Sequence, residues 1–246
     1  MVILLTLHLN DTISFFGNLH SQFGRIMEYE LIKKVQASYS YERNITELIL
    51  PFNDEWMVFW GGDTKELNYH IENAAQKNAF DFVIIDNNGK TFKYDGTVNE
   101  DYYAFGKEII APCDGKIVLA VDGVKDNIPG RMNPYFATGN AIIMITENNE
   151  YILFVHLKQN SLLVVEGQDV KKGDIIGLCG NSGNSSEAHL HFHIQNIEDI
   201  NFATGMKCYF ERIMVNGEEI LDYSPIRNDR VRNRKRKMSE SNHLAQ

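Results

Sequence analysis

The sequence predicts a mainly β protein, built as an antiparallel β-sheet or sandwich with few helices. Between Leu48 and Ser224, short runs of β-branched and aromatic residues alternate with turns rich in Gly, Asp and Asn, a pattern typical of antiparallel sheets. The same range lacks the apolar periodicity of a long amphipathic helix. Hydrophobic residues make up 43% of the chain and charged residues 23%, so the composition is that of a globular protein with a buried core.

The predicted strands follow one another along the chain, and each ends at a turn. They cover residues 57–60, 80–85, 116–121, 141–146, 151–156, 162–165 and 175–178. Two of them, 141–146 and 151–156, flank a short Glu- and Asn-rich stretch and are expected to form a hairpin.

We expect three parts in the chain: a lead-in segment at residues 1–47, a folded domain at 48–225 and a basic, disordered tail at 226–246. The apolar pattern stops after Pro225, and the net charge of −9 hides a cluster of basic residues there. The cluster consists of Arg227, Arg230, Arg232, Arg234, Lys235, Arg236 and Lys237. The rest of the chain is therefore more acidic than the total suggests, which argues against nucleic-acid binding by the folded body.

Two common kinds of segment are not expected. No apolar run approaches the roughly 20 residues that span a bilayer, and the first residues lack the basic region and cleavage site of a signal peptide. Cys113, Cys179 and Cys208 contain no CxxC pair, so we expect buried thiols and no closed cysteine-rich zinc site.

Three histidines alternate with apolar residues in the segment 188–194, directly after a Gly-, Ser- and Asn-rich run. The histidines are His189, His191 and His193, and the apolar residues are Leu190, Phe192 and Ile194. In a strand the histidines would share one face and the apolar residues would face a core. Imidazoles on one face can hold a metal ion, or they can lie on a solvated surface. The pattern alone leaves both interpretations open.

Other candidate residues lie next to predicted strands. His70 and His156 do so, and Asp81 stands inside the apolar stretch 79–85, where an unpaired carboxylate would be costly. The motifs HExxH, GxSxG and the P-loop are absent from the sequence, so a metallohydrolase of this sequence would use a histidine for proton transfer.

Four separated blocks of the sequence resemble the lysostaphin-type zinc endopeptidases, in the same order. They are residues 105–118, 154–157, 165–183 and 189–192. Upstream, the chain resembles a branch of the family whose first metal motif is stretched, through Trp60-Gly-Gly, Asn68-Tyr-His70 and Phe80-Asp-Phe82. The resemblance implies the duplicated hybrid-motif fold and a metallopeptidase domain over 48–225.

The resemblance also implies roles for individual residues. His70, Asp81 and His191 would hold one zinc ion, while His156 and His189 would act on the reacting water and the developing oxyanion. His70 and Asp81 are eleven residues apart, whereas many members have four, so Asp86 is the second choice for the carboxylate. His193 stands where many relatives have Glu and is assigned a supporting or structural role.

The implied function is zinc-dependent hydrolysis of peptide bonds in peptidoglycan cross-bridges or stem peptides, which also implies work outside the membrane. One alternative is a non-catalytic relative that binds a cell-wall peptide or regulates a partner hydrolase. Another is a histidine phosphocarrier of the glucose-specific IIA type, which 154–156 and 166–174 also resemble. The sequence predicts a peptide or peptidoglycan partner and does not predict an oligomeric state.

Overall fold

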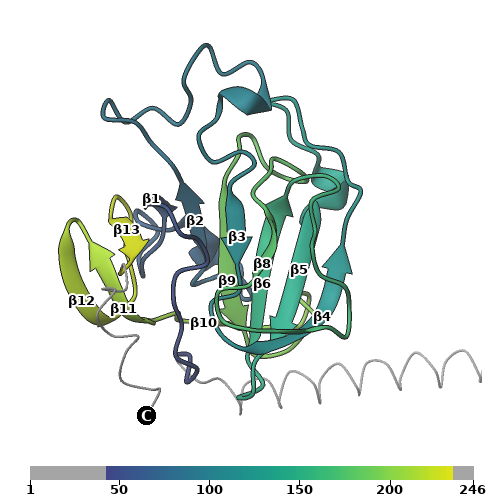
Figure 1. The fold of residues 1–246 in the computed structure, drawn as a ribbon, viewed down its shortest axis with the longest axis vertical. Helices are drawn as coiled ribbons and strands as arrows, with labels where there is room; N and C mark the ends of the chain where they lie inside the picture. The colour runs from purple at the N-terminus through teal and green to yellow at the C-terminus, as the bar shows by residue number, and fades with distance from the viewer. Residues whose placement is uncertain (1–42, 235–246) are drawn as a thin grey trace, which may run out of the picture. The chain divides into compact units, whose positions relative to one another are not determined.

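The computed structural model describes residues 43–234, which form β-strands and three short 3-10 helices (Figure 1). Every pairing between named strands is antiparallel, so the predicted fold class is confirmed. No helix within the described range is long and apolar enough to cross a membrane.

Strands account for most of the regular structure between residues 43 and 234. In chain order they are β1 (Trp56–Trp60), β2 (Phe80–Val83), β3 (Glu108–Ile110), β4 (Gly115–Val121), β5 (Asn140–Ile145), β6 (Tyr151–Leu157), β7 (Asp169–Val170), β8 (Ile175–Leu178), β9 (Leu190–Gln195), β10 (Gly205–Met206), β11 (Phe210–Val215), β12 (Glu218–Tyr223) and β13 (Arg230–Asn233). The 3-10 helices are η1 (Tyr69–Glu72), η2 (Asn99–Asp101) and η3 (Pro134–Phe136).

One large sheet organises the molecule, with the strand order β12-β11-β13-β1-β2-β9-β6-β5-β4-β7 and with β10 paired to β9. β3 and β8 form a separate two-stranded sheet. Figure 1 shows β9 lying between β2 and β6 in the middle of the large sheet. Strands far apart in the sequence therefore meet at the centre, where the predicted histidines lie.

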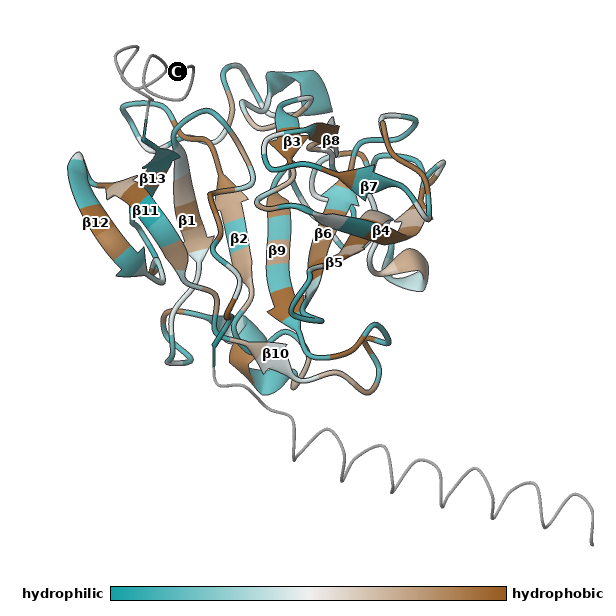
Figure 2. Ribbon diagram, turned by 60° about the horizontal axis from the view of Figure 1, so that its bottom comes forward, coloured by the Kyte–Doolittle hydropathy of each residue, from teal (hydrophilic) through white to brown (hydrophobic). Residues whose placement is uncertain are grey.

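The main core covers one face of these central strands. Leu190, Phe192 and Ile194 of β9 are fully buried in it, and the ring of Phe192 lies edge-on to that of Phe154 of β6, with centroids 5.5 Å apart. Ile176 of β8 belongs to the same cluster. The expected inward face of the 188–194 segment is confirmed, and Figure 2 shows hydrophobic and hydrophilic residues alternating along β9. The histidines are thereby directed to the opposite face.

Most predicted strands are present, and the hairpin between residues 141–146 and 151–156 is confirmed by the pairing of β5 with β6. The strand predicted at 162–165 is wrong. The backbone N–H of Leu162 donates to Asp122 and that of Val165 donates to Gln168. Between them, Leu163 donates to the carbonyl of Ile176 in β8, so a backbone bond to a strand alternates with bonds to side chains and no ladder forms. Leu163 and Val165 are 62% and 66% exposed.

The prediction of a disordered tail from residue 226 is wrong for residues 226–234. β13 pairs with β1 and β11, and Val231 is fully buried between them. Arg230 and Arg232 flank it and lie 3.8 Å from the carboxylate of Glu55. The arginines thus alternate with core positions and do not form a solvated run. Residues 1–42 and 235–246 lie outside the described residues.

The three cysteines are free and buried, as the sequence predicts. Burial raises the pKa of the Cys113 thiol to about 12, and it raises the pKa of Cys208 well above its ordinary value. Both thiols therefore stay protonated and behave as small apolar groups.

Candidate metal centre and its pocket

The centre of the site is a pair of residues on neighbouring strands. Asp81 of β2 is directly opposite His191 of β9 in the antiparallel register, so their side chains emerge on the same face. Oδ1 of Asp81 lies 2.9 Å from Nδ1 of His191, and both residues are buried. Asp81 stands between Phe80 and Phe82, which belong to the main core, and this explains a carboxylate inside an apolar run.

A third residue, His70, reaches the pair from the 3-10 helix η1. Asn68 caps this helix: its Oδ1 accepts the backbone N–H of His70 at 3.2 Å and lies 2.8 Å from Nδ1 of the imidazole. The amide group of Asn68 donates to the carbonyl of Ala79, so its oxygen is the atom that faces the imidazole. Nδ1 of His70 therefore donates, and the unprotonated Nε2 lies 3.5 Å from Oδ2 of Asp81.

His70, Asp81 and His191 fit a metal ion by their chemistry. One ligand atom from each lies within 4.8 Å of the others, and all three residues are buried. Burial lowers the pKa of His70 to about 3 and that of His191 well below its ordinary value, so both rings are neutral at pH 7. Neutral imidazoles with a carboxylate are ligands for zinc. Without a cation, the carboxylate would be buried among uncharged rings.

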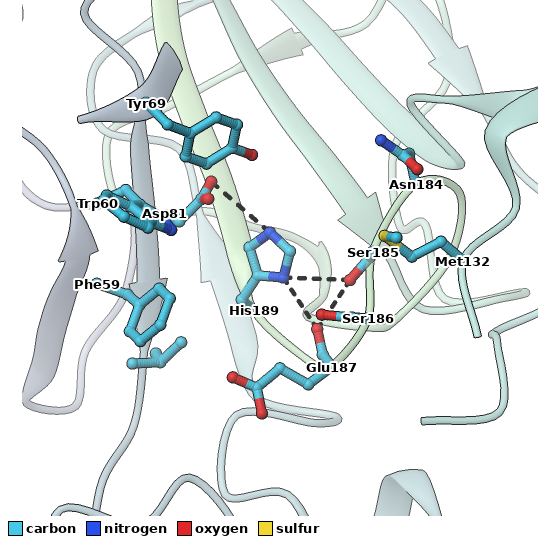
Figure 3. A pocket seen from close by; sticks show the side chains of 11 residues that line it. Phe59, Trp60, Tyr69, Asp81, Met132, Asn184, Ser185, Ser186, Glu187 and His189 are labelled. Carbon is cyan, nitrogen blue, oxygen red and sulfur yellow. Dashed lines mark hydrogen bonds and ion pairs between the residues drawn. The ribbon is translucent and has the colours of Figure 1, made fainter. Parts of the chain in front are cut away.

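His189 stands just before β9 and faces the same centre. Its Nδ1 lies 2.9 Å from the carbonyl of Glu187 and 3.1 Å from Oγ of Ser185 (Figure 3). Because Nδ1 donates to that carbonyl, Nε2 is the free nitrogen, and it lies 3.6 Å from Oδ1 of Asp81. The side chain is 14% exposed, so His189 is the most accessible histidine of the cluster.

His156 belongs to β6, and an irregularity of this strand directs its side chain toward the other histidines. Its φ is 66°, in the left-handed region that is uncommon for a residue other than Gly, and the register between β5 and β6 shifts at this point. Such a bulge redirects a side chain. Nδ1 of His156 lies 2.8 Å from the carbonyl of Ser182, and its ring centroid is 4.8 Å from that of His189. Burial lowers the pKa of His156 well below its ordinary value.

All five residues assigned from the resemblance are thus brought together: His70, Asp81, His156, His189 and His191. Asp86 is not, because it lies in the turn after β2, where its Oδ1 accepts the backbone N–H groups of Asn88 and Lys90. His193 contacts His191 through its Nδ1, which lies 3.1 Å from Nε2 of His191. The interpretation of a solvated histidine face is wrong, since His191 and His193 are both buried.

A pocket of about 300 Å³ opens beside this centre, and both Asp81 and His189 line it. Figure 3 shows His189 between the two walls of the pocket. One wall is formed by Phe59, Trp60 and Tyr69, and the other includes Met132, Asn184 and Ser185. A group in this pocket would lie against Asp81 and His189.

The aromatic wall was not predicted from the sequence. The rings of Trp60 and Tyr69 meet edge to face at 5.2 Å, and the guanidinium of Arg227 lies 4.1 Å over the Trp60 ring. Burial, with Asp81 nearby, raises the pKa of Tyr69 to about 12, so its phenol is a hydrogen-bond donor at neutral pH. The only available signal was the position of Trp60 and Tyr69 close to His70 and the Gly-Gly pair.

Comparison with known proteins confirms the resemblance for part of the chain: residues 100–202 match the model of peptidase family M23. This segment contains His156, His189 and His191, whereas His70 and Asp81 precede it. The match covers less than half of the chain and shows a likeness to a peptidase family. The roles of the five residues stay predictions.

Curated relatives are similar over short stretches. The peptidoglycan DD-endopeptidase ShyA of Vibrio cholerae is 24% identical over 144 residues, which cover 58% of this chain and 26% of that protein. An uncharacterized metalloprotease of Haemophilus influenzae is 37% identical over 93 residues, 36% of this chain and 16% of that protein. The matched part of the chain therefore spans about a quarter or less of each relative.

Two solved structures are also similar. Lysostaphin from Staphylococcus simulans matches with 19% identity over 68% of this chain and 52% of that one, with a TM-score of 0.38. A glycyl-glycine endopeptidase LytM of Ruminococcus gnavus, described as putative, matches with 17% identity over 58% and 42% of the two chains, with a TM-score of 0.31.

Proposed function

We propose that this chain is a zinc-dependent endopeptidase that hydrolyses peptide bonds of peptidoglycan, in cross-bridges or stem peptides. The observation that carries the proposal is the convergence of two histidines and an aspartate with two further histidines beside one pocket. The match to a peptidase family over residues 100–202 supports the reaction type. The activity named for the Vibrio cholerae relative supports the substrate class, and such a substrate would place the protein outside the membrane.

In this proposal the ion would be held by Nε2 of His70, a carboxylate oxygen of Asp81 and Nδ1 of His191. A bound zinc ion supplies a Lewis acid that activates water near neutral pH and polarises a carbonyl oxygen. Three protein ligands are the usual number at a catalytic zinc site, which keeps one position open. The pocket lined by Asp81 and His189 would give a substrate access to a bound ion.

His189 and His156 carry the protons. The Nδ1 of each ring is held by a backbone carbonyl, of Glu187 and Ser182 respectively. Each neutral ring therefore has an unprotonated Nε2, which can accept a proton from water and return it to the leaving amine. After accepting a proton, the imidazolium also stabilises negative charge on the carbonyl oxygen of the substrate.

Cleavage of purified peptidoglycan by the full chain tests the proposal, with soluble fragments identified by mass spectrometry. We expect one zinc per wild-type chain and release of peptide fragments. His191→Ala should lose both zinc and activity, and His156→Ala should keep the zinc but lose at least 100-fold in rate, on the order of a general acid–base contribution.

Two results would contradict the proposal in different ways. Equal, substoichiometric zinc in the wild type and in His191→Ala would contradict the metal centre. Stoichiometric zinc without cleavage of any peptidoglycan would contradict the enzymatic function and favour the non-catalytic, peptide-binding alternative.

A further inference from the structure

A chain of hydrogen bonds runs along the buried histidine face of β9, away from the pocket. It begins at Gln195, which is fully buried. The amide nitrogen of Gln195 donates to the backbone carbonyls of Ile197 at 2.7 Å and Glu198 at 2.9 Å. Both of its hydrogens are thereby used, and turning the amide over would place its oxygen against two carbonyl oxygens. The orientation of Gln195 is therefore fixed.

The fixed amide determines which nitrogen of His193 carries the proton. Oε1 of Gln195 can only accept, and it lies 3.0 Å from Nε2 of His193, so this nitrogen donates. His193 is fully buried, where a charged ring would be costly. The neutral ring then has an unprotonated Nδ1.

The proton position on His193 in turn determines the proton position on His191. Nδ1 of His193 lies 3.1 Å from Nε2 of His191, so Nε2 of His191 must donate. The neutral His191 ring is left with its lone pair on Nδ1, which lies 2.9 Å from Oδ1 of Asp81. Two acceptor atoms at this distance repel each other unless a cation lies within reach of both.

We propose that His193 and Gln195 are positioning residues that fix the tautomer of His191, so that Nδ1 is presented to a metal ion. The inference rests on the proposed metal centre. Hydrogen-bond partners of this kind orient metal-ligating histidines and raise their affinity for the ion. His193 touches neither the pocket lining nor Asp81 in the contacts described for residues 43–234, so it acts through His191.

Two substitutions of His193 separate a positioning role from a packing role. His193→Leu removes both the acceptor for His191 and the donor for Gln195, and we expect zinc affinity to fall about 10- to 100-fold. His193→Gln offers an amide oxygen to His191 and an amide hydrogen to Gln195, and should retain affinity within about threefold. Affinity is measured by competition with a chromogenic chelator.

Ile194→Ala is the matched control, since Ile194 is buried on the opposite, core-facing side of the same strand. This variant should lower stability through a cavity and leave the zinc affinity unchanged. A fall in affinity as large as that of His193→Leu would show that β9 responds to any loss of packing, and would overturn the inference.

The metal-free wild type gives a test that requires no variant. Nitrogen-15 correlation spectra distinguish the two neutral tautomers of histidine. We expect His191 and His193 both to carry their proton on Nε2. A proton on Nδ1 of His191 would overturn the inference, as would an unchanged zinc affinity in His193→Leu. If the wild type binds no zinc, the proposed function fails, while the spectra still decide the tautomers.

Discussion

At the scale of single residues, the site depends on which nitrogen of each imidazole is free. Backbone carbonyls or amide oxygens hold one nitrogen of His70, His156 and His189. In each case the held nitrogen is Nδ1, so Nε2 is the nitrogen left available to the candidate metal centre. The protonation pattern of the centre is therefore determined by its surroundings, before any ion or substrate arrives.

Asn68 allows a direct test of this idea, because it has two functions. It caps η1 through the backbone N–H of His70 and holds Nδ1 of the same residue. Asn68→Ser preserves a capping side chain but is too short to hold the ring. We expect zinc affinity about 10-fold weaker, measured by chelator competition. Asn73→Ser, which also alters a side chain bonded to the backbone near η1, should bind zinc like the wild type; equal affinity in all three proteins would contradict the prediction.

At the scale of elements, the pocket is built from segments that are distant in the sequence. β1 supplies Phe59 and Trp60, and η1 supplies Tyr69. Arg227, in the turn before β13, does not line the pocket but lies over the ring of Trp60. The side chain of Arg227 also donates to the carbonyl of Glu66, 2.9 Å away. Arg227 thus connects the face of Trp60 to the segment that precedes η1.

We predict that Arg227→Ala raises the KM for peptidoglycan fragments up to about fivefold, with little change in kcat. The reason is that Trp60 loses a cation–π contact of about 0.5–1 kcal/mol that holds the wall in place. Steady-state kinetics on a soluble fragment measure the effect. Arg212→Ala is the control, since Arg212 pairs with Glu219 on an exposed hairpin and, within residues 43–234, has no ring contact with the aromatic wall. An unchanged KM would contradict the role given to Arg227.

Those parts of the site that depend on a local sequence pattern could be predicted. Alternation in 188–194 predicted both the core face and the histidine face of β9, and the apolar neighbours of Asp81 indicated a partnered carboxylate. Arg227 and Gln195 could not be found in this way. Arg227 contacts Trp60, which is far away in the sequence, and Gln195 donates to a backbone carbonyl in a turn, so no local pattern indicates either contact. β13 was missed because one buried residue, Val231, between arginines gives too weak an apolar signal.

At the scale of the whole molecule, the cluster of buried histidines has a consequence for stability. Burial lowers the pKa of His70 to about 3 and that of His193 to about 4, and it lowers those of His156 and His191 well below the ordinary value. An unfolded chain protonates the same rings near pH 6.5. Below that pH, the unfolded state therefore binds more protons than the folded state, and acidification favours unfolding.

We predict that the free energy of unfolding of the metal-free protein falls as the pH is lowered from about 6.5 to 5, by up to about 1.4 kcal/mol per pH unit for each buried histidine. Ordinary carboxylates titrate mainly below this range. Urea unfolding at several pH values measures the slope, and His193→Gln should make it shallower. A stability independent of pH over this range would contradict the neutral, buried state of these rings.

The central claim is that His70, Asp81 and His191 form a metal centre. The most direct measurement is a crystal structure of the full chain grown with zinc, with anomalous data collected at the zinc absorption edge. We predict one strong peak about 2.0–2.2 Å from Nε2 of His70, a carboxylate oxygen of Asp81 and Nδ1 of His191. Full zinc occupancy at another site, with these three residues unliganded, would contradict the account.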